Sequence, residues 1–516
     1  MLSKPLDNLF NWNPQLFREI KGRLKTRNVA IAISASLLCQ FIVMMVFLAN
    51  LPEKHGENVL SYNKYCITIG GNYYNCIAID WSTWWLDVSK TFSWILLALM
   101  LLGGIYMLVA DLGKEKRLGT LNFICLTPKP SHNILLGKLL GVPILIYLAV
   151  AISLPLHLWA IISSGLSLSW FFGFYGVVIT ACCFFYNASL IFVFLGGTQA
   201  WLATTIVGIF GFIVIAISDD YIDNFFLITN IKYQRIISLI VFGFILGIYW
   251  TWKAVNRLYK NPSATVISKK QSYWLMGCFQ IYLLLFFLEY PGKESSDFVD
   301  LEKSMFLLFT INLIWFLLVI TFLSPQRQNI QDWARYRHQK VNNDETAIVK
   351  GLSISLKQDL ILGEKSPALV AIGINLVITG LIWSSWILLW HDNEIKLRAI
   401  LTLILSLNLI LIYAAIAQFV LLMKVKKPVI WAVGILGSLI SLPPIALLLL
   451  SITPHSNSNL WLFSTFPWSS ISYNSTSIAS MLIAIIGQWS VLTLVTLQLT
   501  RKIRKLGSSN SQKLLT

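Results

Sequence analysis

Charged residues are scarce in this sequence. Asp, Glu, Lys and Arg make up 12% of its 516 residues, whereas a soluble domain typically carries about 25%. Between Leu139 and Ser218 no charged residue occurs, and apolar runs of about 18 residues or more recur along the chain. This scarcity excludes an ordinary soluble domain and predicts an all-α polytopic membrane protein.

The motifs of catalysis and metal binding are missing as well. Nothing matches the Gly-x-x-x-x-Gly-Lys-Ser/Thr loop that cradles ATP phosphates, and Gly363 to Ser366 lacks its spacing and is expected to be a plain loop. The histidines include no pair at metal-ligand spacing, and His157, which lies in an apolar run, is expected to be a packing residue. No nucleophile motif occurs. We therefore expect no catalytic residue, no metal site and no cofactor in this chain.

The seven cysteines form no metal-binding pattern either. Cys66 and Cys76 share one loop that is predicted to lie outside the membrane, where oxidising conditions permit a disulfide. The sequence leaves two states equally open there, a disulfide and two free thiols.

The charges that do occur are mostly positive, with a net charge of +17. An excess of Lys and Arg in short loops marks the cytoplasmic side of a membrane. Anionic lipids and a soluble partner account for this basicity, so no nucleic-acid partner is expected. The alternation of basic and acidic loops predicts about twelve spans with both termini in the cytoplasm, at residues 29–51, 92–110, three within 139–218, 236–252, 273–289, 305–323, 367–390, 399–423, 428–450 and 477–499.

The spans fall into two sets of six with the same order of spans and loops. The first half is residues 1–262 and the second is residues 263–516. Each half has its large inner loop between its second and third spans, at 111–138 and at 324–366. Internal duplication is a common transporter design, with the pathway at the interface between repeats.

The N-terminal residues predict an amphipathic helix before the first span. They contain no apolar region ending in a cleavage site, so no signal peptide is expected. From Pro14 to Arg27, apolar residues recur at helical spacing and cations fill the other positions, which predicts a helix lying on the cytoplasmic leaflet. The apolar residues are Leu16, Phe17, Ile20 and Leu24, and the cations are Arg18, Lys21, Arg23, Lys25 and Arg27.

The loop at 111–138 carries the most specific pattern. Thr120 is expected to cap a short helix from Leu121 to Leu126. Two prolines, Pro128 among them, then break that helix, and Ser131 is expected to cap the next one. A short helix that lies along the membrane surface and is fixed at both ends is suited to transmitting a force from a soluble partner to the spans.

The spacing of Glu115, Gly119-Thr120-Leu121, Thr127-Pro128, Ser131 and Gly137-Lys138 resembles the coupling segment of type-2 ABC exporter permeases. The chain departs from that pattern at Leu118 and Asn122. The resemblance implies a membrane subunit in a bacterial plasma membrane that transports by alternating access. It would be driven by a separate ATPase subunit that docks to it and holds ATP and Mg. It leaves open whether one chain forms the permease or a second permease chain pairs with it. The docking residues implied are Arg18, Lys21, Arg23, Glu115, Lys116, Arg117, Gly119, Thr120, Leu121, Thr127, Pro128 and Ser131.

Two other classes of function remain as alternatives. A non-transporting membrane scaffold would also lack charges inside its spans. An ion-coupled secondary transporter is disfavoured, because such proteins usually hold carboxylates or cations at mid-membrane. The amides inside the spans, such as Asn312 and Asn375, are expected to join helices by hydrogen bonds. An uncharged pathway favours a lipid-like or amphiphilic cargo.

Overall fold

The computed structural model describes residues 12–51, 64–67, 78–121, 129–217, 231–287, 298–343, 349–390, 393–453, 457–470 and 476–508. Its contacts divide the chain into two compact units, Met1–Pro262 (unit 1) and Ser263–Thr516 (unit 2). Within the described ranges, ten helices are long and apolar enough to cross a membrane. The chain is therefore an all-α, multi-pass membrane protein in its main features.

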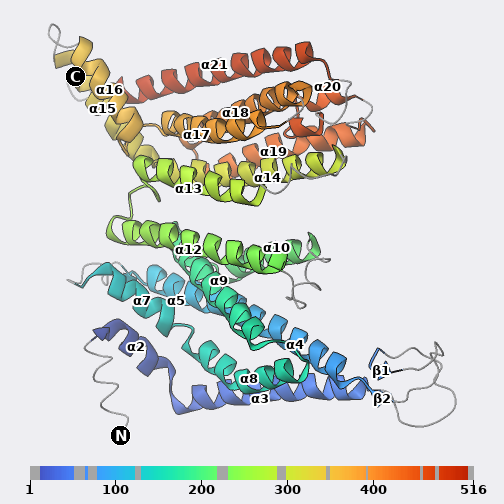
Figure 1. The fold of residues 1–516 in the computed structure, drawn as a ribbon. Coiled ribbons are helices and arrows are strands. Elements are labelled where there is room, and N and C mark those ends of the chain that lie inside the picture. The colour runs from blue at the N-terminus through green and yellow to red at the C-terminus, as the bar shows by residue number, and fades with distance from the viewer. Residues whose placement is uncertain are drawn as a thin grey trace. The chain divides into compact units, whose positions relative to one another are not determined.

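Unit 1 is a bundle of long helices with short helices at one end and a hairpin at the other (Figure 1). Helix α9 packs against α12 and α5, and α3 and α4 pack against α8. The described part of the uncharged stretch contains three long apolar helices, at Ile144–Ser163, Leu168–Phe194 and Ala200–Ile217, as the sequence predicts. The elements are α2 (Pro14–Arg23), α3 (Thr26–Ala49), β1 (Cys66–Ile67), β2 (Ala78–Ile79), α4 (Trp81–Ala98), η1 (Leu99–Gly103), α5 (Gly104–Arg117), α7 (Ser131–Gly141), α8 (Ile144–Ser163), α9 (Leu168–Phe194), α10 (Ala200–Ile217) and α12 (Ile231–Lys260).

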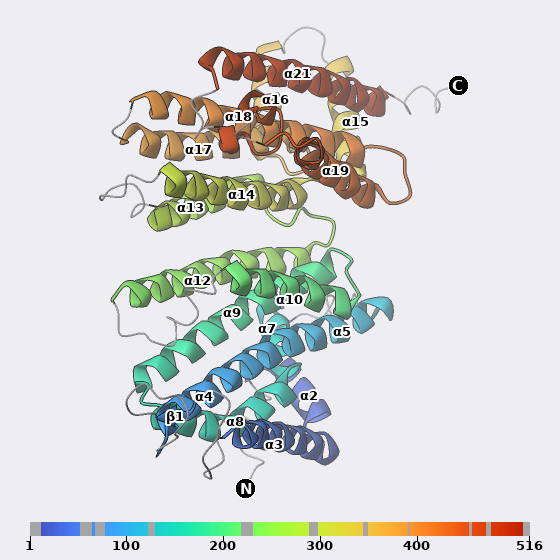
Figure 2. The same ribbon diagram turned by 90° about the vertical axis from the view of Figure 1, so that its right-hand side faces the viewer.

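Unit 2 is built around α18, which packs against α17, α19 and α21 and runs beside α21 (Figure 2). The predicted inner loop at 324–366 is largely helical, because it contains α15 and α16. The elements are α13 (Lys269–Phe287), α14 (Phe298–Leu323), α15 (Arg327–Asn343), α16 (Val349–Leu362), α17 (Leu369–Leu388), α18 (Asn393–Leu421), α19 (Pro428–Leu449), α20 (Ser458–Trp461), η2 (Pro467–Ser470) and α21 (Ile478–Ser508).

The second predicted span is part of a longer helix than the sequence indicated. Helices α4, η1 and α5 run on without a break from Trp81 to Arg117, so the first residues of the predicted loop 111–138 continue the helix. The element η1 is a π-helical turn, a feature that often marks a bend or a functional position. The Tyr186 hydroxyl of α9 donates to the Met100 carbonyl in this turn, at 2.5 Å.

The far end of unit 1 carries a short antiparallel hairpin, in which Cys66 pairs with Ile79. Cys66 is disulfide-bonded, and Cys76 lies outside the described residues, so the pairing of these two cysteines stays a prediction. Asp80 then caps α4 by accepting from the backbone of Ser82 and Thr83. Hydrogen bonds from the Ser82 and Thr83 side chains lower the pKa of Asp80 to about 2.

Buried polar side chains join helices inside both units. In unit 1, His157 lies between Ser93 and Tyr175 at 3.1 and 2.8 Å and is fully buried, which fits the packing role expected of it. In unit 2, Gln280 donates to Asn312 and accepts from the Trp383 indole, both at 2.7 Å. These contacts connect α13 to α14 and α17.

Replacing Gln280 tests whether these amides stabilise the bundle. In Gln280→Leu, the Trp383 N–H and the Asn312 carbonyl lose their partners, and an unpaired buried polar group costs about 1–3 kcal/mol. We expect a clearly lower melting temperature for the purified protein in detergent. Thr310→Val is the matched control, because Thr310 is only partly buried and its hydroxyl donates to the Phe306 carbonyl of its own helix. Equal melting temperatures for the two variants would contradict the stabilising role.

Candidate functional site

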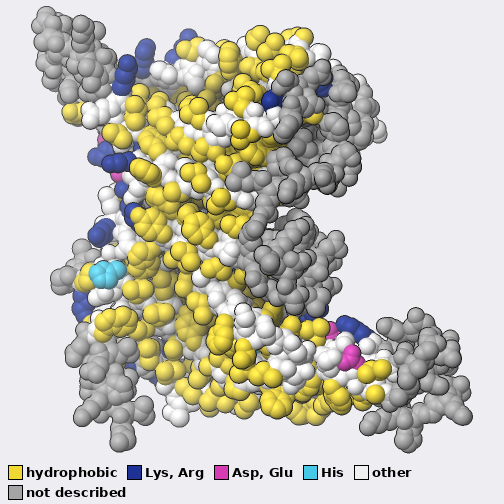
Figure 3. All heavy atoms as spheres, in the orientation of Figure 1, with side chains coloured by type: hydrophobic (Ala, Val, Ile, Leu, Met, Phe, Trp, Pro, Cys, Tyr) yellow, Lys and Arg dark blue, Asp and Glu magenta, His cyan; other side chains and the backbone are white. Residues whose placement is uncertain are grey.

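Charged side chains gather at the end of unit 1 where α2, α5 and α7 meet. The space-filling view shows basic side chains along this edge of unit 1, next to a largely apolar surface (Figure 3). We call the cluster the junction. It comprises Arg18, Glu19 and Arg23 of α2, Asp111 and Glu115 of α5, and Lys138 of α7, which gives three cations and three carboxylates.

Lys138 is the centre of the junction. Its ammonium lies 2.8 Å from a Glu19 oxygen, 2.8 Å from an Asp111 oxygen and 2.6 Å from a Glu115 oxygen, and its side chain is 3% exposed. Burial lowers the pKa of this lysine, but the charges of Asp111, Glu19 and Glu115 outweigh burial and raise it. Lys138 therefore stays charged and ties three helices together.

Arginines of α2 complete the junction at its rim. Arg23 donates to Asp111 at 2.5 Å and lies 3.4 Å from Glu19. Arg18 is more exposed and lies 3.3 Å from Glu19 and 3.6 Å from Glu115. Each carboxylate therefore faces more than one cation, which offsets the cost of removing its charge from water.

Two glycines let α2 approach α7 closely. A Cβ atom on Gly137 would lie 2.8 Å from the Leu16 backbone nitrogen, and one on Gly141 would lie 2.5 Å from the Glu19 Cβ. Gly137 and Gly141 are four residues apart and so lie on one face of α7, an arrangement typical of close helix pairs in membranes. Gly137 thus lets α7 contact α2, and the neighbouring Lys138 supplies the charge at the centre of the junction.

The three carboxylates alone have the geometry of a cation site. One oxygen each from Glu19, Asp111 and Glu115 lies within 4.8 Å of the others. The Lys138 ammonium, however, contacts an oxygen of every one of them, in the position that a metal ion would take. The residues present therefore fit an ion-pair cluster and not a metal centre.

Two of the cations predicted to dock a partner also bond to the chain's own backbone. Lys116 donates to the carbonyls of Val193 and Phe194, the last residues of α9, at 2.5 and 3.0 Å. Arg117 donates to the Thr198 carbonyl at 3.2 Å. The Lys116 ammonium adds hydrogen bonds to carbonyls at the C-terminus of α9, so Lys116 has a structural role.

Beyond Arg117 the chain forms an exposed tip, which we define as Leu118, Gly119 and Thr120. Leu118 is 67% exposed, and Gly119 has φ +73°, a left-handed conformation that favours glycine after a helix. Thr120 donates to the Glu115 carbonyl at 3.1 Å. This bond ties Thr120 back to α5, and Thr120 and Leu121 are themselves helical. The predicted role of Thr120 as the cap of the helix from Leu121 stays a prediction, because the residues after Leu121 lie outside the described ranges.

The remaining predicted residues are placed as follows. Leu121 is buried, and Lys21 is exposed, 5.7 Å from the centre of the Phe17 ring. Ser131 is not a cap, because α7 begins after Pro130 without a side-chain cap. Its hydroxyl donates instead to Asn256 of α12, at 2.9 Å. Thr127, Pro128 and the predicted helix 121–126 beyond Leu121 lie outside the described residues.

Unit 2 contains a buried lysine at the start of α13 that bonds to the segment after α16. Lys269 is 2% exposed and donates to the Leu360 and Pro367 carbonyls and to the Ser366 hydroxyl, at 2.9, 3.0 and 2.6 Å. Arg337 of α15 pairs with Asp359 of α16. The stretch from Gly363 to Ser366 is a loop, as expected, and Ser366 closes the end of α16 through the Asp359 carbonyl.

The sequence did not identify Glu19, Asp111 and Lys138 as members of one cluster. A signal was present for two of them, since Glu19 is the only acid among the cations of α2 and Lys138 is an isolated charge before a long uncharged run. Pairing them requires knowing that α2 folds back onto α7, across more than a hundred residues of chain. Comparison with protein-family models, curated proteins and solved structures gives no match to this chain.

Proposed function

We propose that this chain is the membrane-spanning permease subunit of an ATP-driven exporter of the type-2 ABC class. The main support for this proposal is the tip after α5. The tip is exposed, whereas α5 itself is joined to α2 and α7 by the ion pairs of the junction. A force applied at Leu118 would reach Asp111 and Glu115 within two turns of one helix. Through Lys138 and Glu19 it would move α2 and α7 as well.

The orientation follows from the charges. Basic residues at the junction end of unit 1 and at the end of α21 in unit 2 belong on the cytoplasmic side by the positive-inside rule. With α10 and α13 counted as spans, each unit contributes six helices, and both termini lie in the cytoplasm of a bacterial cell. The ATPase subunit supplies ATP and Mg, and the uncharged spans favour an amphiphilic cargo moved by alternating access.

The chemistry of the tip fits a protein partner. Leu118 is an exposed apolar side chain next to exposed Lys114 and Arg117. Binding hot spots are typically single large side chains that become fully desolvated, surrounded by polar contacts. At position 118 the resembled family usually has a charged residue. We propose that in this chain Leu118 is instead the apolar side chain that the partner buries.

Replacing Leu118 tests the proposal. We expect Leu118→Gln to weaken co-purification with the ATPase subunit by about tenfold or more, since loss of a hot spot typically costs about 2 kcal/mol or more. Leu389→Gln is the matched control, because Leu389 is also a helix C-cap residue and is 76% exposed. It should leave binding unchanged. Transport in cells that lack every candidate ATPase would refute the proposal.

Charge reversal at Lys116 would be a poor test of docking. Its ammonium binds the last carbonyls of α9, so a glutamate at this position would disturb the helix end as well as any partner contact. Leu118 makes no such contact within the part of the chain that the structure describes, which separates binding from folding.

A further inference from the structure

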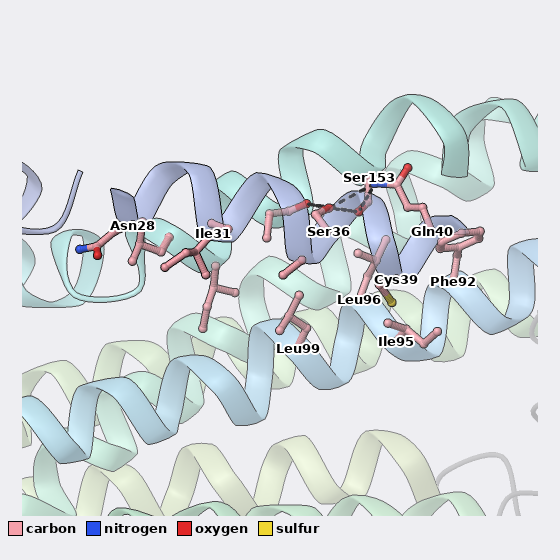
Figure 4. A pocket seen from close by; sticks show the side chains of 15 residues that line it. Asn28, Ile31, Ser36, Cys39, Gln40, Phe92, Ile95, Leu96, Leu99 and Ser153 are labelled. Carbon is pink, nitrogen blue, oxygen red and sulfur yellow. Dashed lines mark hydrogen bonds between the residues drawn. The ribbon is translucent and has the colours of Figure 1, made fainter. Parts of the chain in front are cut away.

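A membrane-facing cleft in unit 1 lies between α3, α4 and α8, away from the junction. It has a volume of about 430 Å³, and eleven of the fifteen residues that line it are apolar. Small-molecule sites typically measure about 300–1,000 Å³ and combine apolar walls with a few polar groups. Figure 4 shows Ser36, Gln40 and Ser153 joined by hydrogen bonds beside Phe92 and Leu96.

The hydrogen bonds fix the orientation of the Gln40 amide. The Ser36 and Ser153 hydroxyls both reach the Ala149 carbonyl, at 2.8 and 3.2 Å, and lie 3.0 Å from each other. With their hydrogens donated in this way, both hydroxyl oxygens can accept a hydrogen bond. The Gln40 NH₂ group supplies it, at 3.2 Å to each.

The carbonyl oxygen of Gln40 is then left over. It accepts no hydrogen bond from any residue that the structure describes, although Gln40 is only 9% exposed. This oxygen is not among the fully enclosed polar atoms, so it can accept a hydrogen bond from a group outside the protein. Because Gln40 lines the cleft, a ligand in the cleft that offers an O–H or N–H donor would satisfy this oxygen.

The cleft opens toward lipid. Ile31 and Ala35 line it and are also exposed on α3, a helix that crosses the membrane. The lining runs from Asn28 to Gln40 along α3, a distance of about 18 Å at the helical rise. Such a groove can hold an extended hydrocarbon chain that enters sideways from the bilayer.

We propose that this cleft binds one long-chain amphiphile from the bilayer. The hydrocarbon chain lies along Ile31, Ala35 and Leu99, and a hydroxyl or amide donor of the ligand bonds to the Gln40 carbonyl. The proposal rests on unit 1 alone and does not depend on the ATPase proposal, so either can fail without the other.

Photo-crosslinking tests the site. The purified protein in lipid nanodiscs is irradiated with a diazirine-bearing analogue of hexadecan-1-ol, and labelled peptides are mapped by mass spectrometry. We expect adducts on the lining segments of α3 and α4, displaced by hexadecan-1-ol at concentrations about tenfold lower than by hexadecane. Equal competition by the alkane, or adducts spread evenly over all lipid-facing helices, would overturn the proposal.

Two tryptophan variants localise the binding. Ala35→Trp fills the cleft and should abolish the specific adducts, whereas Leu37→Trp adds the same side chain on the opposite face of α3 and should keep them. Melting temperatures show whether both variants fold, and Ala35→Leu replaces Ala35→Trp if the larger side chain is not tolerated. Undiminished labelling of a folded Ala35 variant would also overturn the proposal.

Discussion

Lys138→Met is expected to be among the most damaging single substitutions in unit 1. It leaves Glu19, Asp111 and Glu115 close together with only the rim arginines to balance them. Removing one partner of a buried ion pair typically costs about 3–5 kcal/mol. For a unit of this size, a loss of that order lowers the melting temperature by roughly 10 °C, which thermal unfolding of the purified protein would measure.

The pH dependence of the loss identifies its cause. Without the ammonium, repulsion among the three carboxylates raises the pKa of at least one of them in the folded variant. A group whose pKa is raised by folding contributes stability at low pH that is lost as pH rises through the raised value. The gap between Lys138→Met and the native protein should therefore narrow as the pH is lowered from 8 toward 5.

Two further variants serve as controls for Lys138. Lys114→Met removes the same charge from an exposed position on α5 and should leave the melting temperature nearly unchanged. Adding Glu19→Gln to Lys138→Met removes one of the three stranded charges and should recover part of the loss. If Lys138→Met melts like Lys114→Met, the junction does not hold these helices together.

The helices were the most predictable part of this protein. Long uncharged runs and a period of 3.6 residues specify a membrane helix almost regardless of its neighbours, and α3 and the three helices after Leu139 lie close to where the sequence placed them. Helix α2 begins at the predicted Pro14 but ends at Arg23, short of the predicted Arg27. Helix ends were less predictable. The sequence ended the second span at Ala110, whereas Lys116 binds the end of α9 and Glu115 binds Lys138, and these distant contacts accompany a helix that continues to Arg117.

The junction was predictable only in part. The sequence identified Glu115, Arg18 and Arg23 as residues of one surface, but as groups that face a partner. It could not distinguish a cation that faces solvent from one that binds a distant carbonyl, as Lys116 does. The π-turn could not be predicted from the sequence. Nothing in the Gly103-Gly104 pair indicates that Tyr186 will lie against one of the two glycines.

Gly104→Ala is the second substitution with a large expected effect. A Cβ atom on Gly104 would lie 1.9 Å from the Tyr186 hydroxyl oxygen and 2.3 Å from its ring. Tyr186 must move away and break its bond to Met100, which combines an overpacking cost of about 1–3 kcal/mol with a lost hydrogen bond worth about 1 kcal/mol. We expect a markedly lower melting temperature and faster hydrogen exchange around the π-turn.

Gly103→Ala provides the matched control for the turn. The one close contact of the new Cβ atom would be with the flexible end of Ile146, at 2.9 Å, so this variant should lose little stability although it lies next to Gly104. Tyr186→Phe removes the hydroxyl without adding bulk and should fall between the two. If Gly103→Ala and Gly104→Ala melt alike, the contact of Tyr186 with the π-turn does not set its geometry. If they differ as expected, the contact of Tyr186 fixes the π-turn between the cleft-lining part of α4 and the junction on α5.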